Sequence, residues 1–202
     1  MNKIKLKGVI RDIQYSHTIG DVEYDKANII VTRKDGKEDI LSLRFKKFSN
    51  PYQDNQICSL VGNVRSYSKK ISEDKNKVEL YVFTYFDIPD LNENDQEVIN
   101  EFELDGRICK IDELRTTKDG KQNIHFILAN NLIFDNNNQK LNSYIPIIAW
   151  GPIAKMVSEL NVNDRINVIG ELHSREYRKT FEDGSYEIRV AHEGVANYIE
   201  IK

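Results

Sequence analysis

The chain has little of what marks secreted, membrane-spanning or disulfide-stabilised proteins. Its 202 residues include only two cysteines, Cys58 and Cys109, which lie far apart in apolar stretches without a Cys-x-x-Cys pair. We therefore expect two free, buried thiols in a reducing compartment rather than a disulfide or a zinc site. No apolar run approaches the roughly 18 residues of a membrane-spanning helix. Charges also interrupt the apolar N-terminal positions, unlike in a signal peptide, so we expect a cytoplasmic protein without membrane contact.

The signals of enzymatic chemistry are also missing. The four histidines, His17, His125, His173 and His192, are scattered along the chain. His192 and Glu193 are adjacent, whereas zinc deaminases need His-x-Glu together with Cys-x-x-Cys. Metal nucleases need clustered carboxylates and histidines, and nucleotide-binding enzymes need a glycine-rich loop with its lysine. We therefore expect no enzymatic activity, no metal and no cofactor.

The charge is unevenly distributed along the chain. The formal net charge is −3, but residues 87–104 alone carry seven acidic residues and no basic one. Residues 1–86 carry a balance of +5 and residues 105–202 a balance of −1. Since nucleic-acid binding depends on local basic surface rather than on total charge, the composition permits a nucleic-acid partner without indicating one.

The hydrophobic pattern on both sides of the acidic segment is that of β-strands. Apolar and polar residues alternate over 4–10, 102–108 and 166–172, and Asp-Gly turns separate other apolar runs. Period-two alternation with such turns predicts hairpins and meanders. We therefore predict an all-β chain with an N-terminal domain over residues 1–88, an acidic linker over 89–101 and a C-terminal domain over 102–202.

The two halves repeat each other. In each half, a first strand reaches a glycine (Gly8, Gly106), and a fourth strand ends at another (Gly62, Gly170). A basic and aromatic hairpin and a final apolar strand follow in both halves. The simplest explanation is a duplicated five-stranded unit.

One helix is predicted between the third and fourth strands of the second half. It begins at Pro152, a favourable first helical residue, and places Ile153, Met156, Val157 and Leu160 on one face. Five strands with a helix at this place form the OB-fold arrangement. The corresponding segment of the first half is too short and polar for this helix, so we expect its barrel to be closed differently.

The second half carries the two ingredients with which an open barrel binds single-stranded nucleic acid. Aromatic rings stack the bases, and cations lie beside the phosphates. The candidate stacking residues are Phe134, Tyr144, Trp150 and Tyr177. The candidate phosphate-binding residues are Arg107, Lys110, Arg115, Lys155, Arg175, Arg178 and Lys179. A place in the core is the alternative for each aromatic residue.

The order of short motifs in the second half is more specific. From Glu103 the text ELDGRICKIDELRTTKDGKQNIHFILANNLIF is followed by YIPIIAWG, which ends at Gly151, and by INVIGELHSREYR, which begins at Ile166. Over about 100 residues this order resembles the bacterial single-stranded DNA-binding protein family. The resemblance implies base stacking on the four aromatic residues above, and it implies phosphate contacts for Arg107, Arg115, Arg175 and Arg178.

Two departures from that family affect the expectations. The chain ends at YIEIK without the flexible acidic-tipped tail through which the family recruits partners. It also has two predicted barrels where the family usually has one, and the first half resembles the family only in outline. Our candidate residues there are Phe45, Phe48, Tyr52, Tyr67, Arg44, Lys46, Lys47, Arg65, Lys69 and Lys70. A solvated basic face over core aromatics is the alternative for this set.

The expected function is sequence-independent binding of single-stranded DNA during replication, repair or recombination. Two linked barrels raise the effective concentration of the second binding event, and a homodimer would bring four barrels together. Replication or repair proteins are further candidate partners. The alternative is an OB-fold scaffold of a primosome or replisome with weak DNA binding.

Overall fold

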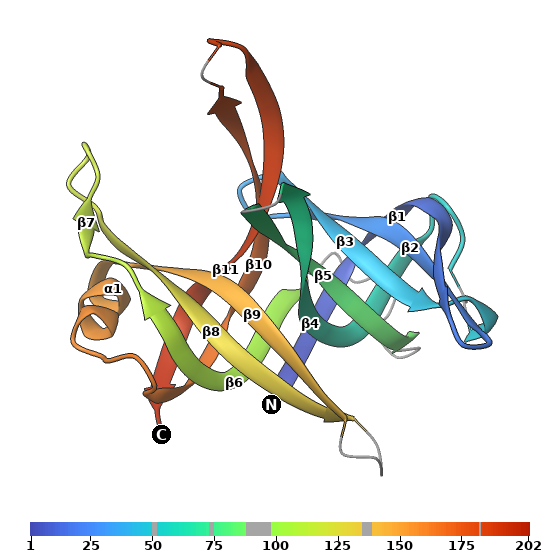
Figure 1. Ribbon diagram of the computed structural model, residues 1–202, viewed down its shortest axis with the longest axis horizontal. Helices are drawn as coiled ribbons and strands as arrows, with labels where there is room; N and C mark the ends of the chain where they lie inside the picture. Colours follow the sequence, from blue (N-terminus) through green and yellow to red (C-terminus); the bar gives the residue numbers. More distant parts are fainter. Residues whose placement is uncertain (50–51, 73–74, 88–97, 135–138, 182) are drawn as a thin grey trace.

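A computed structural model describes residues 1–49, 52–72, 75–87, 98–134, 139–181 and 183–202 (Figure 1). The N-terminal half consists of β1 (Asn2–Ile19), β2 (Val22–Thr32), β3 (Glu38–Lys46), the 3₁₀ turn η1 (Lys47–Ser49), β4 (Ile57–Ser72) and β5 (Lys75–Asp87). The C-terminal half consists of β6 (Asn100–Ile111), β7 (Arg115–Thr116), β8 (Gln122–Phe134), β9 (Gln139–Trp150), α1 (Gly151–Ser158), β10 (Arg165–Thr180) and β11 (Tyr186–Ile201). Most of the predicted linker lies outside the described residues.

The described strands form two closed barrels within one eleven-stranded sheet. In the first barrel β1 pairs with both β2 and β4, and β3 pairs in parallel with β5. In the second barrel β6 pairs with both β8 and β10, and β9 pairs in parallel with β11. The barrels are joined where β1 pairs antiparallel with β6, from Asn2↔Leu104 to Leu6↔Asn100. The predicted all-β tandem OB fold is confirmed.

The internal repeat extends to four glycines at equivalent places. A Cβ on Gly8 or Gly106 would come within 3 Å of the carbonyl oxygen of Ile30 or Ala129, respectively. Gly62 and Gly170 lie equally close to carbonyls of the last strand of their barrels. Because a side chain does not fit where two strands approach so closely, the same requirement places glycine at both repeats.

The two barrels are closed by different groups. In the second barrel, α1 packs Ala154 and Val157 into the core, and Ile153, Met156 and Leu160 pack partly buried against it. In the first barrel, the buried ring of Tyr52 contacts the ring of Phe45 edge-on, with 5.1 Å between centroids. The Tyr52 hydroxyl hydrogen-bonds Thr84 Oγ1 at 2.9 Å.

These positions correct part of the sequence-based prediction. Phe45 is 3% and Tyr52 6% exposed, so neither offers a ring face for stacking. Cys58 is buried as predicted, whereas Cys109 is exposed on β6, and neither cysteine forms a disulfide. Cys109 is exposed because it lies on the outer face of its strand, where its thiol donates to the carbonyl oxygen of Ile127.

An ion pair with a buried carboxylate fixes the first barrel against the second. Asp39, at the start of β3, is fully buried and accepts two hydrogen bonds from the Arg33 guanidinium. The same carboxylate accepts the backbone N–H of Ser174 in β10 at 2.6 Å. Arg33 also donates to the carbonyl oxygen of Ser174, and Ser174 Oγ accepts the N–H of Ile40. We call Arg33, Asp39, Ile40 and Ser174 the inter-barrel latch.

Candidate nucleic-acid interface

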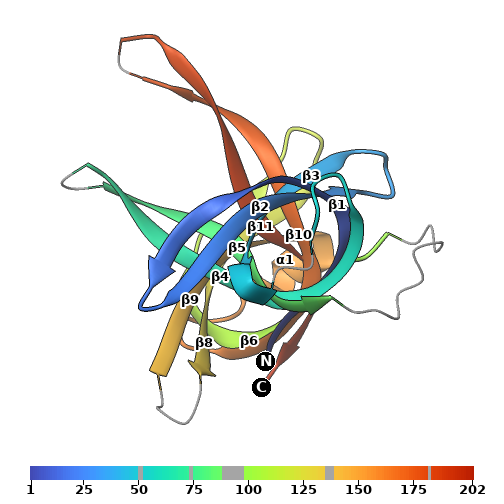
Figure 2. The ribbon, with the colours of Figure 1, turned by 90° about the vertical axis from the view of Figure 1, so that its right-hand side faces the viewer.

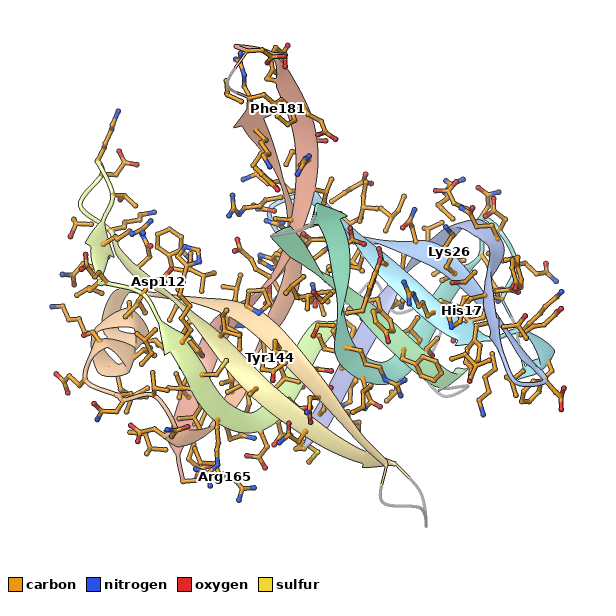
Figure 3. All side chains as sticks on the ribbon, in the orientation of Figure 1. His17, Lys26, Asp112, Tyr144, Arg165 and Phe181 are labelled. Carbon is orange, nitrogen blue, oxygen red and sulfur yellow. The ribbon has the colours of Figure 1, made fainter. Side chains whose placement is uncertain are left out.

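The outer face of β9 carries two exposed aromatic rings. Along this strand Ile145, Ile147 and Ala149 point into the barrel and are fully buried. The alternate residues Tyr144 and Trp150 are 47% and 39% exposed. They lie six positions apart on the same face, which corresponds to about 20 Å along the strand. Both predicted stacking residues therefore offer ring surface to solvent, and Figure 3 shows Tyr144 on the β9 ribbon.

Strand register places arginines in the same rows as these rings. Trp150 pairs with Asn123 of β8, and Asn123 pairs with Arg115 of β7. Directly paired residues of neighbouring antiparallel strands lie on the same face, so Arg115 and Trp150 share a face two strands apart. Tyr144, Ala129 and Arg107 form a second row of this kind. However, Arg107 Nη1 donates to the carbonyl oxygen of Asn163 at 2.8 Å, which engages this guanidinium.

Trp150 lines a cavity of about 840 Å³ at the beginning of α1. The other lining residues are Gly120, Lys121, Gln122, Gly151, Pro152 and Lys155. Two lysines and an indole thus surround one concave surface, which suits a base with its phosphate. The sequence indicated Trp150 and Lys155 but not Lys121, although Lys121 belongs to a turn that its motif included.

The β10–β11 hairpin forms an arm that projects from the body of the molecule (Figures 1 and 2). Tyr177 pairs with Arg189, and Arg175 pairs with Ala191, so these side chains share one face with Lys179. Arg178 pairs with Ile188 on the opposite face, where its guanidinium lies 3.8 Å from the centroid of Tyr186. The structure therefore groups Arg175, Tyr177 and Lys179 and separates Arg178 from them.

A cleft of about 520 Å³ lies where the arm meets both barrels. Arg175 and Tyr177 line it from the arm, His125 and Pro146 from β8 and β9, and Ser42, Val78, Glu79 and Leu80 from the first barrel. Glu193 also lines it and accepts a hydrogen bond from Arg175 Nε at 2.8 Å, with His125 Nδ1 at 3.9 Å. The cleft joins the β8–β9 face to the first barrel, and the sequence did not indicate its histidine or its proline.

Three predicted residues of the second half contribute neither to the outer face of β9 and its cavity nor to the cleft. Lys110 forms an ion pair with Asp112 at 2.7 Å, and this hydrogen bond holds the pKa of Asp112 below its ordinary value. Part of the lysine charge is thus already compensated. Arg178 lies on the far face of the arm. The side chain of Phe134, at the end of β8, lies outside the described residues.

The first barrel shows a different pattern. Tyr67, Arg44 and Arg65 are half-buried on its outer face, where Arg44 contacts the rings of Tyr67 and Tyr81. Phe48 is 75% exposed on η1, beside the exposed Lys46 and Lys47. Lys47 pairs with Glu23 at 2.6 Å. The side chains of Lys69 and Lys70 lie outside the described residues.

Neither a metal site nor a membrane-spanning helix is found among the described residues. They contain no group of three or more His, Cys, Asp or Glu side chains that could hold a metal ion. The helix they contain is too short and too polar to cross a membrane.

The comparisons with known proteins concern both halves. Residues 99–197 match the model of the single-strand binding protein family. A deletion mutant of the single-stranded DNA binding protein from Thermus aquaticus superposes with a TM-score of 0.72 at 20% identity, over 100% of this chain and 94% of that one. The wild-type single-stranded DNA binding protein from Thermus aquaticus superposes with a TM-score of 0.72 at 19% identity, over 100% of this chain and 93% of that one. A search of curated proteins found no match.

The two kinds of match support different statements. The structural likeness, below 25% identity, shows that both barrels and their arrangement belong to a known tandem fold. The family match covers the half that carries Tyr144, Trp150 and Tyr177, and this family is a non-enzymatic DNA-binding family. The resemblance seen in the sequence is thus confirmed: the C-terminal part of the chain, residues 99–197, belongs to the single-strand binding protein family.

Proposed function

We propose that the protein binds single-stranded DNA without sequence preference by stacking bases on Trp150, Tyr144 and Tyr177. The carrying observation is the outer face of β9, where the rings of Tyr144 and Trp150 are exposed and Trp150 lies beside Arg115, Lys121 and Lys155. Each stacked base contributes about 1–3 kcal/mol. Every base has a flat face, so this contact does not select among sequences.

The cations of the second barrel supply the second part of the binding energy. Lys155 and Lys121 lie in the cavity of Trp150, Arg115 shares its row, and Arg175 lies at the cleft. Neutralising phosphates releases counterions, so affinity falls as salt rises, with a slope of about −0.7 per phosphate for single strands. Coating of single strands during replication, repair or recombination is the role that fits such binding.

The proposed assembly is a homodimer that brings four barrels together. The family is typically oligomeric, and its members usually have one barrel per chain, as noted above. Light scattering after size-exclusion chromatography should give twice the chain mass of 23.5 kDa. A mass of one chain at micromolar concentration would contradict the dimer.

Titration of a fluorescently labelled oligo-dT at two salt concentrations tests the binding function. We expect a polarisation increase with an affinity that falls steeply with salt, and much weaker binding to a blunt duplex of equal length. An OB-fold scaffold of a primosome or replisome would show no steep salt-dependent binding. Equal affinity for duplex and single strand would also contradict the proposal.

A further inference from the structure

Strand register gives the row of Trp150 an equivalent in the first barrel. The row of the second barrel runs across β7, β8 and β9 and consists of Arg115, Asn123 and Trp150. The row of the first barrel runs across β1, β2 and β3 and consists of His17, Tyr24 and Lys46. We call this second set the first-barrel row.

The two rows are equivalent because they lie at the same distance from the repeated glycines. A Cβ on Gly8 would clash with the carbonyl oxygen of Ile30, and Tyr24 lies six positions before Ile30 in β2. The same relation holds in the second barrel for Gly106, Ala129 and Asn123. The place of Trp150 is therefore taken by Lys46, and the rings of the first-barrel row lie on β1 and β2 instead.

The two rings of the first-barrel row are stacked on each other. The centroids of His17 and Tyr24 are 4.9 Å apart, with an interplanar angle of 6°. Tyr24 also packs at a tilt of 53° against Phe83, with 6.1 Å between centroids. This packing supports the parallel pair from the side of the barrel. Parallel rings are the arrangement that a further flat base extends.

His17 is the outermost ring of the pair. Among the described residues, β1 pairs with β4 only from Ile4 to Val9, so no described strand pairs with β1 beside His17 on the side away from Tyr24. The Ser16 hydroxyl hydrogen-bonds His17 Nδ1 at 2.9 Å, which orients the half-buried imidazole. Tyr24 covers one imidazole face, and the other face is therefore turned to the open edge of the sheet.

A further exposed ring and two exposed lysines flank this pair. Phe48, on η1, is 75% exposed, and Nζ of Lys46 lies 5.6 Å from its ring centroid. Lys26 follows Tyr24 by two residues on the same face of β2 (Figure 3). The row thus combines rings with cations, which is the composition of a single-strand binding surface.

The acidic residues of β2 do not cancel these cations. Glu23 forms an ion pair with Lys47 at 2.6 Å, so a separate lysine compensates its charge. Asp25 is 7% exposed and faces the interior of the barrel. The outer face of β2 therefore presents Lys26 beside Tyr24 without an acidic side chain from the same strand.

We propose that the first barrel holds a second stacking site, where one base stacks on His17 and a neighbouring base on Phe48. This inference rests on the proposed binding of single-stranded DNA and adds a contact for it. Lys26 and Lys46 lie beside the phosphates. The β1–β2 hairpin lies at the end of the first barrel away from the second (Figure 1), so only a strand that spans both barrels occupies both sites.

A tryptophan reporter tests this contact directly. The variant His17→Trp/Trp150→Phe places the only tryptophan of the chain in the first-barrel row. The control Tyr198→Trp/Trp150→Phe places it on β11, where Tyr198 is 54% exposed and shares a row with Ile169 and the acidic Glu103. The probe is an oligo-dT of about 32 nucleotides, twice the upper site size of one OB fold. Polarisation of a labelled strand shows when each variant is saturated.

We expect oligo-dT to quench the emission of the His17→Trp/Trp150→Phe variant, because a base stacks on the substituted ring. The emission of the control should change little at the same saturation. In the otherwise unmodified chain, His17→Ala/Tyr24→Ala should lower the affinity for this strand about 5- to 150-fold, which corresponds to one stacked base. Tyr198→Ala should not lower it. Circular dichroism and thermal unfolding check the fold of each variant.

Saturated binding without a change in the emission of the His17→Trp/Trp150→Phe variant would overturn the proposal, whether or not the alanine variant folds. Equal quenching in the control, or full affinity in a folded His17→Ala/Tyr24→Ala variant, would also overturn it. If the unmodified chain does not bind oligo-dT, the proposed function itself fails. If it binds with quenching of Trp150 and the His17 reporter is silent, only the first-barrel site fails.

Discussion

At the scale of single residues, Trp150 carries the largest exposed ring of the candidate face. It is the last residue of β9 and directly precedes α1, with Gly151 at a positive φ of 54° immediately after it. The chain therefore turns sharply at Trp150, because glycine adopts that conformation at low cost. The turn leaves the indole on the outer face beside Lys121 and Lys155 rather than under the helix.

Replacement of Trp150 should lower the affinity for single-stranded DNA. We expect Trp150→Ala to reduce oligo-dT affinity by about 1–3 kcal/mol, the range for one stacked base. Trp150→Phe should lose less, since it keeps a smaller ring. Polarisation of labelled oligo-dT measures both. Unchanged binding by a folded Trp150→Ala variant would remove this residue from the site.

The sequence predicted residue exposure unevenly. Tyr144 was a stacking candidate through the family resemblance, and its exposure agrees with its alternation with the buried Ile145 and Ile147. Alternation along β3 places Phe45 in the core with Leu41 and Leu43. The sequence alone could therefore have excluded Phe45 as a stacking residue. Tyr52 lies outside any strand, and its burial depends on contacts with Phe45 and Thr84. No hydrophobic periodicity in the sequence predicts these contacts.

At the scale of elements, the arm has two faces of different character. One face carries Arg175, Tyr177 and Lys179, of which Arg175 and Tyr177 line the cleft. The other carries Arg178 stacked on Tyr186. The sequence presented these basic and aromatic residues as one cluster. Strand periodicity separates them, because neighbouring side chains of a strand point to opposite faces.

The two tyrosines of the arm provide a matched test of this division. Tyr177→Ala should weaken oligo-dT binding by about 1–3 kcal/mol if one base stacks on it. Tyr186→Ala removes an equal ring from the opposite face and should leave the affinity nearly unchanged. Equal losses in the two variants, measured by the same titration, would show that the arm does not bind through one face.

At the scale of the whole molecule, the inter-barrel latch holds the two candidate faces in a fixed relation. Its carboxylate is fully buried, and 135 residues separate Asp39 from Ser174. The repeat, the five barrel strands of each half and the helix after Trp150 could all be predicted from local patterns, whereas the two-residue strand β7 was not predicted. The latch could not, because no periodicity relates such distant residues.

Loss of the latch should destabilise the protein and loosen its binding to long strands. Asp39→Ala leaves the partly exposed Arg33 without its carboxylate, so we expect a loss of about 3 kcal/mol, the lower end for a broken buried pair. Urea unfolding measures this free energy. The control Asp35→Ala breaks the exposed pair with Lys37 on the same turn and should change little. Equal stability of the two variants would contradict the structural role of Asp39.

Trp150 is the only tryptophan of the chain, so its fluorescence reports the central contact without any label. Titration of the unmodified protein with oligo-dT should quench this fluorescence to a saturating level, because a base stacks on the indole, and the midpoint should shift to higher DNA concentration as salt is raised. Binding detected by polarisation with no change in the emission of Trp150 would contradict the account.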